Sequence, residues 1–511
     1  MATYYFDWDN GSDSNAGASE SAPWKSYDAK FSSTADNDIL YFKRGATQIT
    51  TTAFLGVRNG FRMYAYGSGA KPRWVASDAA AAANMILNFS RRSNIVVEDQ
   101  DFDATGTQRA LYCAAQETGG TPFPTSRITF RRCVFRNGSS DGVQVTQEQT
   151  STARPSFYLF EDCDAHNNGG HGIIAMGQGH WFVRCRAWEN GALVPFGAHG
   201  FSARAARTEV TSGWTLASGT IYYRNLAAAE ETLGVFAVFD LSAPSRPLVQ
   251  NTSTPTTPAD GEFGIDTSTT PDRLYVNVNA NANGRNIVYA WGRTEGLQYI
   301  ACKSFNNVNN PAAPYVEGHG FSADDWTSNT RYIGCISRDN EGLAFSFNRG
   351  GNNTLSGCVA LRNGRAGLQS IAGANNRAIN CLFIDNNSGI YAVTYEIAFA
   401  NATASNCAVT NCVLIGSVSN GVLFDVAAPG TVTNCAINGY TNATSNATAS
   451  GTITSNVRQW INSNGSLRMP GNPLATAGTY VQGVTLANGR LRPGYTPIGA
   501  YMAVQPRAVR V

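Results

Sequence analysis

The stretch CVFRNGSSDGV, residues 133–143, decides the fold, because the chain returns to its pattern many times. CDAHNNGGHGI (163–173) and CVALRNGRAGL (358–368) again show a cysteine, alternating residues, an asparagine, a turn and a glycine before an apolar residue. Cys335 and Cys358 are 23 residues apart. A fixed period of about 20 to 50 residues is the signature of structural units that stack on one another.

Each repeat contains short runs in which apolar and polar residues alternate, separated by asparagine and glycine. Alternation with a period of two predicts strands, and no repeat has the spacing of an amphipathic helix. A chain in which every repeat adds strands to parallel sheets is a β-solenoid, whose turns stack at about 4.8 Å. The sequence therefore predicts an all-β fold, a parallel β-helix.

The cysteine, asparagine and glycine positions of the repeat have structural reasons. Cysteine is small and usually buried, so it suits an inward position where identical side chains stack. Asparagine tolerates left-handed backbone and can bond to the turns above and below, and glycine lets the chain bend. The eleven cysteines recur once per repeat and not in pairs. We therefore expect buried free thiols, compatible with a reducing cytoplasm, and neither a disulfide framework nor a zinc site.

The composition agrees with one long β body and excludes two classes of partner. The chain has 511 residues, 14% of them charged, and a net charge of +2. A nucleic-acid binder would need a basic stripe, so we expect no nucleic-acid partner. No apolar run is long enough to span a bilayer. The opening MATYYFDWDNGSD also lacks the charged and apolar regions of a secretory signal.

One interval breaks the period, because Cys185 and Cys302 are 117 residues apart. The intervening residues contain short alternating runs with Pro, Thr and Ser turns, which predict a small inserted antiparallel β domain. The predicted organisation is an N-terminal cap with the first rungs (1–80), β-helix rungs (81–205), the inserted domain (206–298), further rungs (299–455) and a C-terminal irregular rung with a tail (456–511).

Ionisable residues gather on both sides of the insertion. With the repeats aligned on the glycine that follows each turn, five successive rungs have an ionisable residue before it: Asp141, His171, His199, His319 and Glu341. Strand alternation then points five further side chains outward: Ser202, Arg204, Ser322, Asp324 and Ser346. Arg204 and Asp324 flank the two ends of the insertion, so we expect them side by side in a solvent-facing patch.

Two reactions on sugar polymers fit this patch. β-Elimination on a uronate needs a base, here His199 or His319, and a cation beside the carboxylate, here Arg204. Glycoside hydrolysis needs two carboxyl groups about 5 to 9.5 Å apart, and its candidates are Asp324, Asp325, Glu341, Glu317 and Asp141. A structural role stays open as well, because a histidine can simply bond the next rung and an Arg204–Asp324 salt bridge contributes little.

The remaining candidates are expected to bind substrate, and they are Asp141, His171, Ser202, Ser322, Trp326 and Arg349. No spacing predicts a resident metal site or another cofactor. If the substrate is a uronate, the Asp324–Asp325 pair and Glu341 could hold Ca²⁺, a cation that takes oxygen ligands.

The ends of the chain carry a family resemblance. YYFDWDNGSDSNAGASESAPWKSYDAKF (4–31) resembles the opening of right-handed parallel β-helix proteins of the pectate-lyase-like superfamily. NPLATAGTYVQGVTLANGRLRPGYTPIGAY (472–501) resembles their last irregular rung. The resemblance implies a right-handed coil and a broad class of proteins that act on polysaccharides, but it specifies no substrate.

Within this superfamily the chain resembles phage tailspikes and related polysaccharide depolymerases. That resemblance implies a virion protein of a phage tail or baseplate, folded in the host cytoplasm, that binds and depolymerises a bacterial surface polysaccharide by a glycosidase or lyase reaction. It also implies a homotrimer, because three coils side by side would cover their flanks. Two alternatives stay open: a glycan-binding receptor protein without catalysis, and a bacterial secreted polysaccharide lyase or glycosidase.

Overall fold

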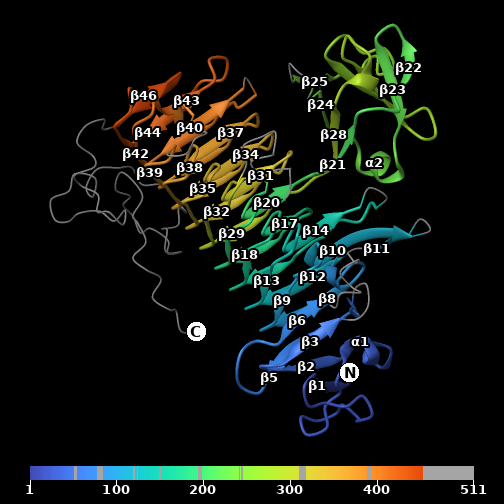
Figure 1. The fold of residues 1–511 in the computed structure, drawn as a ribbon. Helices are drawn as coiled ribbons and strands as arrows, with labels where there is room; N and C mark the ends of the chain where they lie inside the picture. Colours follow the sequence, from blue (N-terminus) through green and yellow to red (C-terminus); the bar gives the residue numbers. More distant parts are fainter. Residues whose placement is uncertain are drawn as a thin grey trace, which may run out of the picture.

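A computed structural model describes residues 1–452 except 51–54, 77–84, 119–120, 124, 149–150, 194–197, 241, 243–245, 310–317, 388–392 and 402. The predicted C-terminal rung (456–511), its family resemblance (472–501) and the candidate carboxyl residue Glu317 lie outside the described residues. The chain winds into a coil of three long parallel sheets, from which one domain protrudes (Figure 1). The predicted all-β parallel β-helix is therefore confirmed. None of the helices in the described part of the chain is long and apolar enough to cross a membrane.

Sheet A has fourteen parallel strands. They are β1 (Thr3–Phe6), β2 (Ile39–Lys43), β5 (Arg62–Tyr66), β8 (Ser93–Glu98), β12 (Ser126–Arg131), β15 (Leu159–Glu161), β18 (Trp181–Val183), β29 (Gln298–Ile300), β32 (Arg331–Ile333), β35 (Thr354–Ser356), β38 (Arg377–Ile379), β41 (Ala408–Thr410), β44 (Gly430–Thr433) and β47 (Ala447–Ser450). The short helix α1 (Tyr27–Lys30) lies at the N-terminal end of the coil (Figure 1). Its Tyr27 side chain is buried against Phe6 and Phe42.

Sheet B has twelve strands. They are β3 (Thr47–Thr50), β6 (Arg73–Ala76), β9 (Asp101–Asp103), β13 (Val134–Arg136), β16 (Asp164–His166), β19 (Arg186–Trp188), β30 (Lys303–Phe305), β33 (Ile336–Arg338), β36 (Val359–Leu361), β39 (Leu382–Ile384), β42 (Val413–Ile415) and β45 (Ala436–Asn438).

Sheet C positions the candidate site. Its strands are β4 (Leu55–Gly56), β7 (Met85–Asn88), β10 (Arg109–Thr118), β14 (Val143–Gln147), β17 (Ile173–Ala175), β20 (Phe201–Arg204), β31 (Phe321–Asp324), β34 (Phe345–Asn348), β37 (Leu368–Ile371), β40 (Tyr395–Ala400), β43 (Asn420–Phe424) and β46 (Asn442–Ser445), with β11 (Thr121–Phe123) paired to β10.

The interior of the coil is filled by stacks of like side chains, one from each rung. The rings of Phe201, Phe321 and Phe345 stack at centroid distances of 5.1 and 5.2 Å, and all three are buried. Tyr299 and Tyr332 from sheet A meet the Phe321 ring edge-on. All eleven cysteines are free and buried, as predicted.

An asparagine ladder runs along one turn of the coil. The side-chain Nδ2 of each asparagine donates to the Oδ1 of the asparagine one rung further on, through Asn190, Asn307, Asn340, Asn363 and Asn386. The last amide, of Asn386, donates to the carboxyl group of the buried Glu396 at 2.6 Å. Burial raises the pKa of Glu396 to about 8.

We expect Glu396→Gln to make the free energy of unfolding less dependent on pH. The unfolded carboxyl has a pKa of about 4.3, so between that pH and about 8 wild-type unfolding releases a proton. The free energy of unfolding of the wild type should therefore fall as pH rises through this window, by up to about 1.4 kcal/mol per pH unit. Urea titrations between pH 5 and 9 measure this slope. The exposed Glu209→Gln is the control, and an unchanged slope in Glu396→Gln would contradict the assignment.

The inserted domain begins directly after β20 and contains one curved eight-stranded sheet. Its elements are β21 (Ala206–Val210), β22 (Thr215–Ser218), β23 (Ile221–Asn225), α2 (Ala228–Leu233), β24 (Ala237–Asp240), β25 (Arg246–Gln250), β26 (Glu262–Asp266), β27 (Arg273–Asn277) and β28 (Ile287–Gly292). Its pairings are antiparallel except between β25 and β26. The domain has its own apolar core and projects from the flank of the coil (Figure 1).

Candidate active site

The outer face of sheet C brings the two ends of the insertion together. Strands β20 and β31 pair in parallel, with Ser202 opposite Ser322 and Arg204 opposite Asp324. Phe201 and Ala203 are part of the coil interior, so the side chains that alternate with them face outward. The predicted adjacency of Arg204 and Asp324 follows directly from this register.

Three histidine rings form a column beside these strands, in which His199 and His319 are stacked and His171 is tilted. The ring of His199 lies between His171, at a centroid distance of 5.0 Å, and His319, at 4.6 Å. The Nδ1 atom of His171 accepts the backbone N–H of His199, and Nδ1 of His319 accepts the backbone N–H of Leu343. The proton of each neutral ring is therefore on Nε2. Burial, followed by the proximity of His199, holds the pKa of His171 and of His319 well below the usual range, so both rings stay neutral.

His199 differs from its neighbours because it pairs with a carboxylate. Its Nε2 lies 3.1 Å from Oδ2 of Asp324. Burial acts to raise the pKa of Asp324, but the hydrogen bond and the charge interaction with His199 outweigh it and hold that pKa well below its usual range. The Asp324 side chain is 17% exposed and that of His199 only 3%. Asp324 is thus an ionised carboxylate that solvent can reach, with the imidazole behind it.

Asp325 lies at the end of β31 and belongs to a separate ion-pair cluster. The backbone leaves the strand there, with φ of 44° at Asp325 and 62° at Trp326. The Asp325 carboxylate is 2.6 Å from Arg207 and 3.3 Å from Arg349, and the residue is 5% exposed. Because β31 ends at Asp324, strand alternation does not determine where the Asp325 side chain points.

Trp326 connects this cluster to the inserted domain. The Arg349 guanidinium lies over the Trp326 ring at 5.5 Å, a cation–π geometry. The Trp326 ring also makes an edge-to-face contact with Phe236, which precedes β24, at a centroid distance of 6.4 Å. The predicted substrate-binding residues Trp326 and Arg349 thus lie together at the junction of coil and inserted domain.

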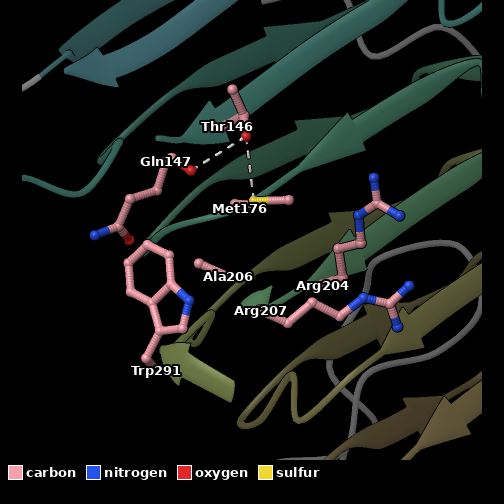
Figure 2. Close-up of a pocket in the computed structure, with 7 residues that line it drawn as sticks. All are labelled: Thr146, Gln147, Met176, Arg204, Ala206, Arg207 and Trp291. Carbon is pink, nitrogen blue, oxygen red and sulfur yellow. Dashed lines mark hydrogen bonds between the residues drawn. The ribbon is translucent and has the colours of Figure 1, made fainter. Parts of the chain in front are cut away.

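A cavity of about 300 Å³ lies at the root of the insertion, between the coil and the inserted domain (Figure 2). Its lining comes from three coil strands and from the first and last strands of the inserted domain. The lining residues are Thr146, Gln147, Met176, Arg204, Ala206, Arg207 and Trp291. In Figure 2 the guanidinium groups of Arg204 and Arg207 lie on the opposite side of the cavity from the Trp291 ring. Burial and the neighbouring Arg207 lower the pKa of Arg204.

The predicted position of Glu341 is wrong. Phe345 pairs with Phe321, so the residue in register with His319 is Leu343, not Glu341. The alignment on glycine fails in this rung because Ala344 occupies the place that glycine holds in the neighbouring rungs. The nearest glycine, Gly342, lies two residues earlier in the chain. Glu341 is exposed in the preceding turn, where its carboxylate accepts the backbone N–H of Asn309 at 2.8 Å.

The solvent-facing patch predicted on the outer face of sheet C is only partly exposed to solvent. Ser202 and Ser322 point away from the coil interior but are each 1% exposed, and His199 and His319 are also buried. Alternation along a strand fixes which side a residue faces, but it does not fix what covers that side. Of the predicted patch, Arg204 and Asp324 retain contact with solvent.

Asp141 and His171 lie further along the same column. The Asp141 carboxylate accepts the backbone N–H of His171 at 2.9 Å and lies 3.8 Å from Arg109. Burial raises the pKa of Asp141. Asp141 and Asp324 are three strands apart in sheet C, by way of β17 and β20, which corresponds to about 14 Å at the usual strand spacing.

Three residues of this site were not predicted from the sequence: Arg207, Gln147 and Met176. Arg207 stands three residues after Arg204 in the stretch SARAAR, and this second arginine beside the insertion was the available signal. Nothing in the sequence indicated that Gln147 and Met176, from other rungs, would meet Trp291 from the end of the insertion.

The residues predicted to hold Ca²⁺ do not form a calcium site. Asp325 is held by two arginines, Asp324 is paired with His199, and the Glu341 carboxylate accepts the backbone N–H of Asn309. Each of the three carboxylates thus already has a partner within the protein. Within the described ranges, no group of three or more His, Cys, Asp or Glu side chains is arranged to hold a metal ion.

Comparisons with known proteins agree with the fold. No family model matches the chain. The chain is 24% identical over 367 residues to pectate lyase L of Dickeya dadantii, covering 66% of this chain and 81% of that protein. It superimposes on the A-module of the mannuronan C-5 epimerase AlgE6 of Azotobacter vinelandii with a TM-score of 0.54 and 14% identity, covering 84% of this chain and 93% of that one.

The A-module of AlgE4 from the same organism gives a TM-score of 0.52 at 12% identity, covering 88% of this chain and 97% of that one. Together with the parallel sheets, these likenesses confirm the predicted parallel β-helix fold.

Proposed function

We propose that this protein is a polysaccharide lyase that cleaves an acidic, uronate-containing polymer by β-elimination on the outer face of sheet C. The observation that carries the proposal is the cluster of Arg204, Arg207 and Arg349 around Asp324 and Asp325. Asp141 also acts on Arg204 but is balanced by Arg109, so these three guanidinium groups against Asp324 and Asp325 leave one positive charge in surplus when His199 is neutral. A uronate carboxylate would balance that charge, and a planar guanidinium matches its geometry.

The reaction assigns different tasks to these groups. Elimination removes the proton at C5 of the uronate, forms a C4–C5 double bond and expels the glycosidic oxygen, which takes up a proton from solvent. Arg204, the cation next to the partly exposed Asp324, would neutralise the uronate carboxylate and so make the C5 proton more acidic. The His199–Asp324 pair would accept that proton, and the Asp324 carboxylate is the part of the pair that solvent reaches.

The geometry favours elimination over hydrolysis. A glycosidase needs one carboxyl group with a raised pKa, about 5 to 9.5 Å from a second carboxylate. The pKa of Asp324 is lowered, and Asp325 is buried between two arginines. Asp141 does have a raised pKa, but it is too far from Asp324.

The hydrogen bonds within the histidine column indicate which histidine could take part in removing the C5 proton. His319 and His171 present Nε2–H groups and not lone pairs, because their Nδ1 atoms accept backbone N–H groups. His319 was a predicted base, and this tautomer leaves it as a neutral spacer that supports His199. The pectate lyase relatives support an enzyme that acts on a polysaccharide, and the arginine cluster extends this to an anionic one.

Incubation with polygalacturonate and with polymannuronate tests the proposal. We expect new reducing ends together with the ultraviolet absorbance of unsaturated uronates from at least one of them, and neither signal from a neutral glucan. Reducing ends without unsaturation would mean hydrolysis, and tight binding with neither signal would mean a glycan-binding protein. Either result would contradict the proposed lyase.

We further propose, from the sequence resemblance, that the protein is a homotrimeric phage tail protein whose substrate is a bacterial surface polysaccharide. A secreted bacterial lyase is the alternative. Light scattering on the purified chain checks the trimer directly, and a monomer would favour the secreted enzyme.

A further inference from the structure

The cavity at the root of the insertion has the composition of a sugar-binding pocket. Trp291 and Met176 give it an apolar wall, Thr146 and Gln147 provide polar groups, and Arg207 adds a positive charge. Sugar rings present apolar faces and polar edges, and this mixture matches both. A volume of about 300 Å³ is at the lower end for ligand pockets and therefore suits a single sugar unit more than a longer segment.

We propose that this cavity binds the uronate residue adjacent to the one that reacts, so that the inserted domain forms part of the polysaccharide site. The proposal rests on the proposed function, because Arg204 belongs both to this cavity and to the proposed reaction centre at Asp324. It lines the cavity and lies opposite Asp324 across the β20–β31 pair. A chain that places one residue at Asp324 would thus have its neighbour next to Arg207 and Trp291.

The Trp291 wall is fixed before any ligand binds. The indole Nε1–H donates to the Thr208 hydroxyl at 3.0 Å, and that hydroxyl donates to the buried Glu230 carboxylate at 2.5 Å. The Tyr289 hydroxyl donates to the same oxygen at 3.0 Å, and the backbone N–H of Ala227 binds the other oxygen at 2.8 Å. This network connects α2 to β21 and β28. A wall held in this way loses little entropy on binding.

The root of the domain is also attached to the coil. The Thr294 hydroxyl donates to the carbonyl oxygen of Arg204 at 2.7 Å and accepts the backbone N–H of Gly177 at 2.9 Å. Met176 donates its backbone N–H to Val145, and its sulfur accepts the hydroxyl of Thr146 at 3.3 Å (Figure 2). Hydrogen bonds therefore hold both the coil side and the inserted-domain side of the cavity in place.

Met176 offers a test that leaves the proton-transfer groups intact. It lies one residue beyond β17, is half-buried and packs against the core of the inserted domain. We expect Met176→Trp to fill the cavity and to raise KM for uronate tetramers and longer chains by about tenfold, with kcat within about twofold of the wild type. Leu216→Trp, which adds the same ring at an exposed position of β22 in the inserted domain, is the matched control and should stay within about twofold in both constants.

The measurement uses the full chain with galacturonate and mannuronate oligomers of increasing length, followed by unsaturated-product absorbance and by calorimetric binding. Loss of affinity in Met176→Trp alone supports the subsite. If the wild type forms unsaturated products but Met176→Trp has an unchanged KM and affinity, the subsite is refuted while the lyase stands. If the wild type neither cleaves nor binds any of these uronates, the lyase proposal fails, and the subsite fails with it. Circular dichroism of both variants verifies that they are folded.

Discussion

Asp324→Asn should lower kcat/KM on a uronate polymer by about 10² to 10⁴-fold, the usual contribution of a positioned acid–base group. The amide keeps the size of the side chain and can still accept the Nε2–H of His199. It can no longer accept the C5 proton, and it removes the negative charge beside Arg204. Because the change is nearly isosteric, we expect kcat to fall much more than KM rises. Initial rates of unsaturated-product formation measure both constants.

The matched control is Asp339→Asn. Asp339 is also an aspartate held by two arginines, Arg338 at 2.9 Å and Arg362 at 2.8 Å, but it follows β33 in sheet B, away from the site. Its substitution should leave kcat/KM within about twofold, because a surface ion pair contributes little. Full activity in Asp324→Asn would remove Asp324 from the reaction and would leave Arg204 without its partner in the proposed mechanism.

Phe321→Ala is expected to cost about 3 to 5 kcal/mol of the free energy of unfolding, as for other large aromatic truncations in cores. Phe321 is fully buried at the centre of a stack, with Phe201 and Phe345 on its two faces and tyrosines from sheet A at its edge. Repeated rungs cannot collapse around a missing ring without breaking the strand register, so the cavity should persist. Urea unfolding followed by circular dichroism measures the loss.

Val426→Ala provides the comparison for this substitution. Val426 is 81% exposed beyond β43, so removing two methyl groups there should change the free energy of unfolding by no more than about 0.5 kcal/mol. If Phe321→Ala were as mild as Val426→Ala, the close-packed interior described for the coil would be incorrect.

The coil could be predicted from the sequence because its repeat states the same structural requirement in every rung. Cysteine marks an inward position, asparagine marks a turn, and alternating residues mark a strand. A repeat whose own pattern is ambiguous can therefore be interpreted from its neighbours. The adjacency of Arg204 and Asp324 followed from this periodicity, although 119 residues lie between them in the sequence.

The candidate site was less predictable because it depends on departures from the repeat. Ala344 in place of glycine shifted the alignment by two residues and misplaced Glu341. The left-handed backbone at Asp325 turned that carboxylate toward Arg207 and Arg349, a contact that no spacing rule states. The cavity beside Trp291 arises where two differently folded parts meet, and a linear pattern carries no information about such a junction.

The continuity of the three sheets across the insertion has a further consequence. β18 pairs with β29, β19 with β30 and β20 with β31, so the coil passes from one rung to the next as if the inserted domain were absent. The insertion point is therefore a graft site: the scaffold can accept, exchange or lose an appendage there without altering its own winding. Recognition of a new polymer could then evolve in the appendage, while the machinery for bond breaking stays on the unchanged coil.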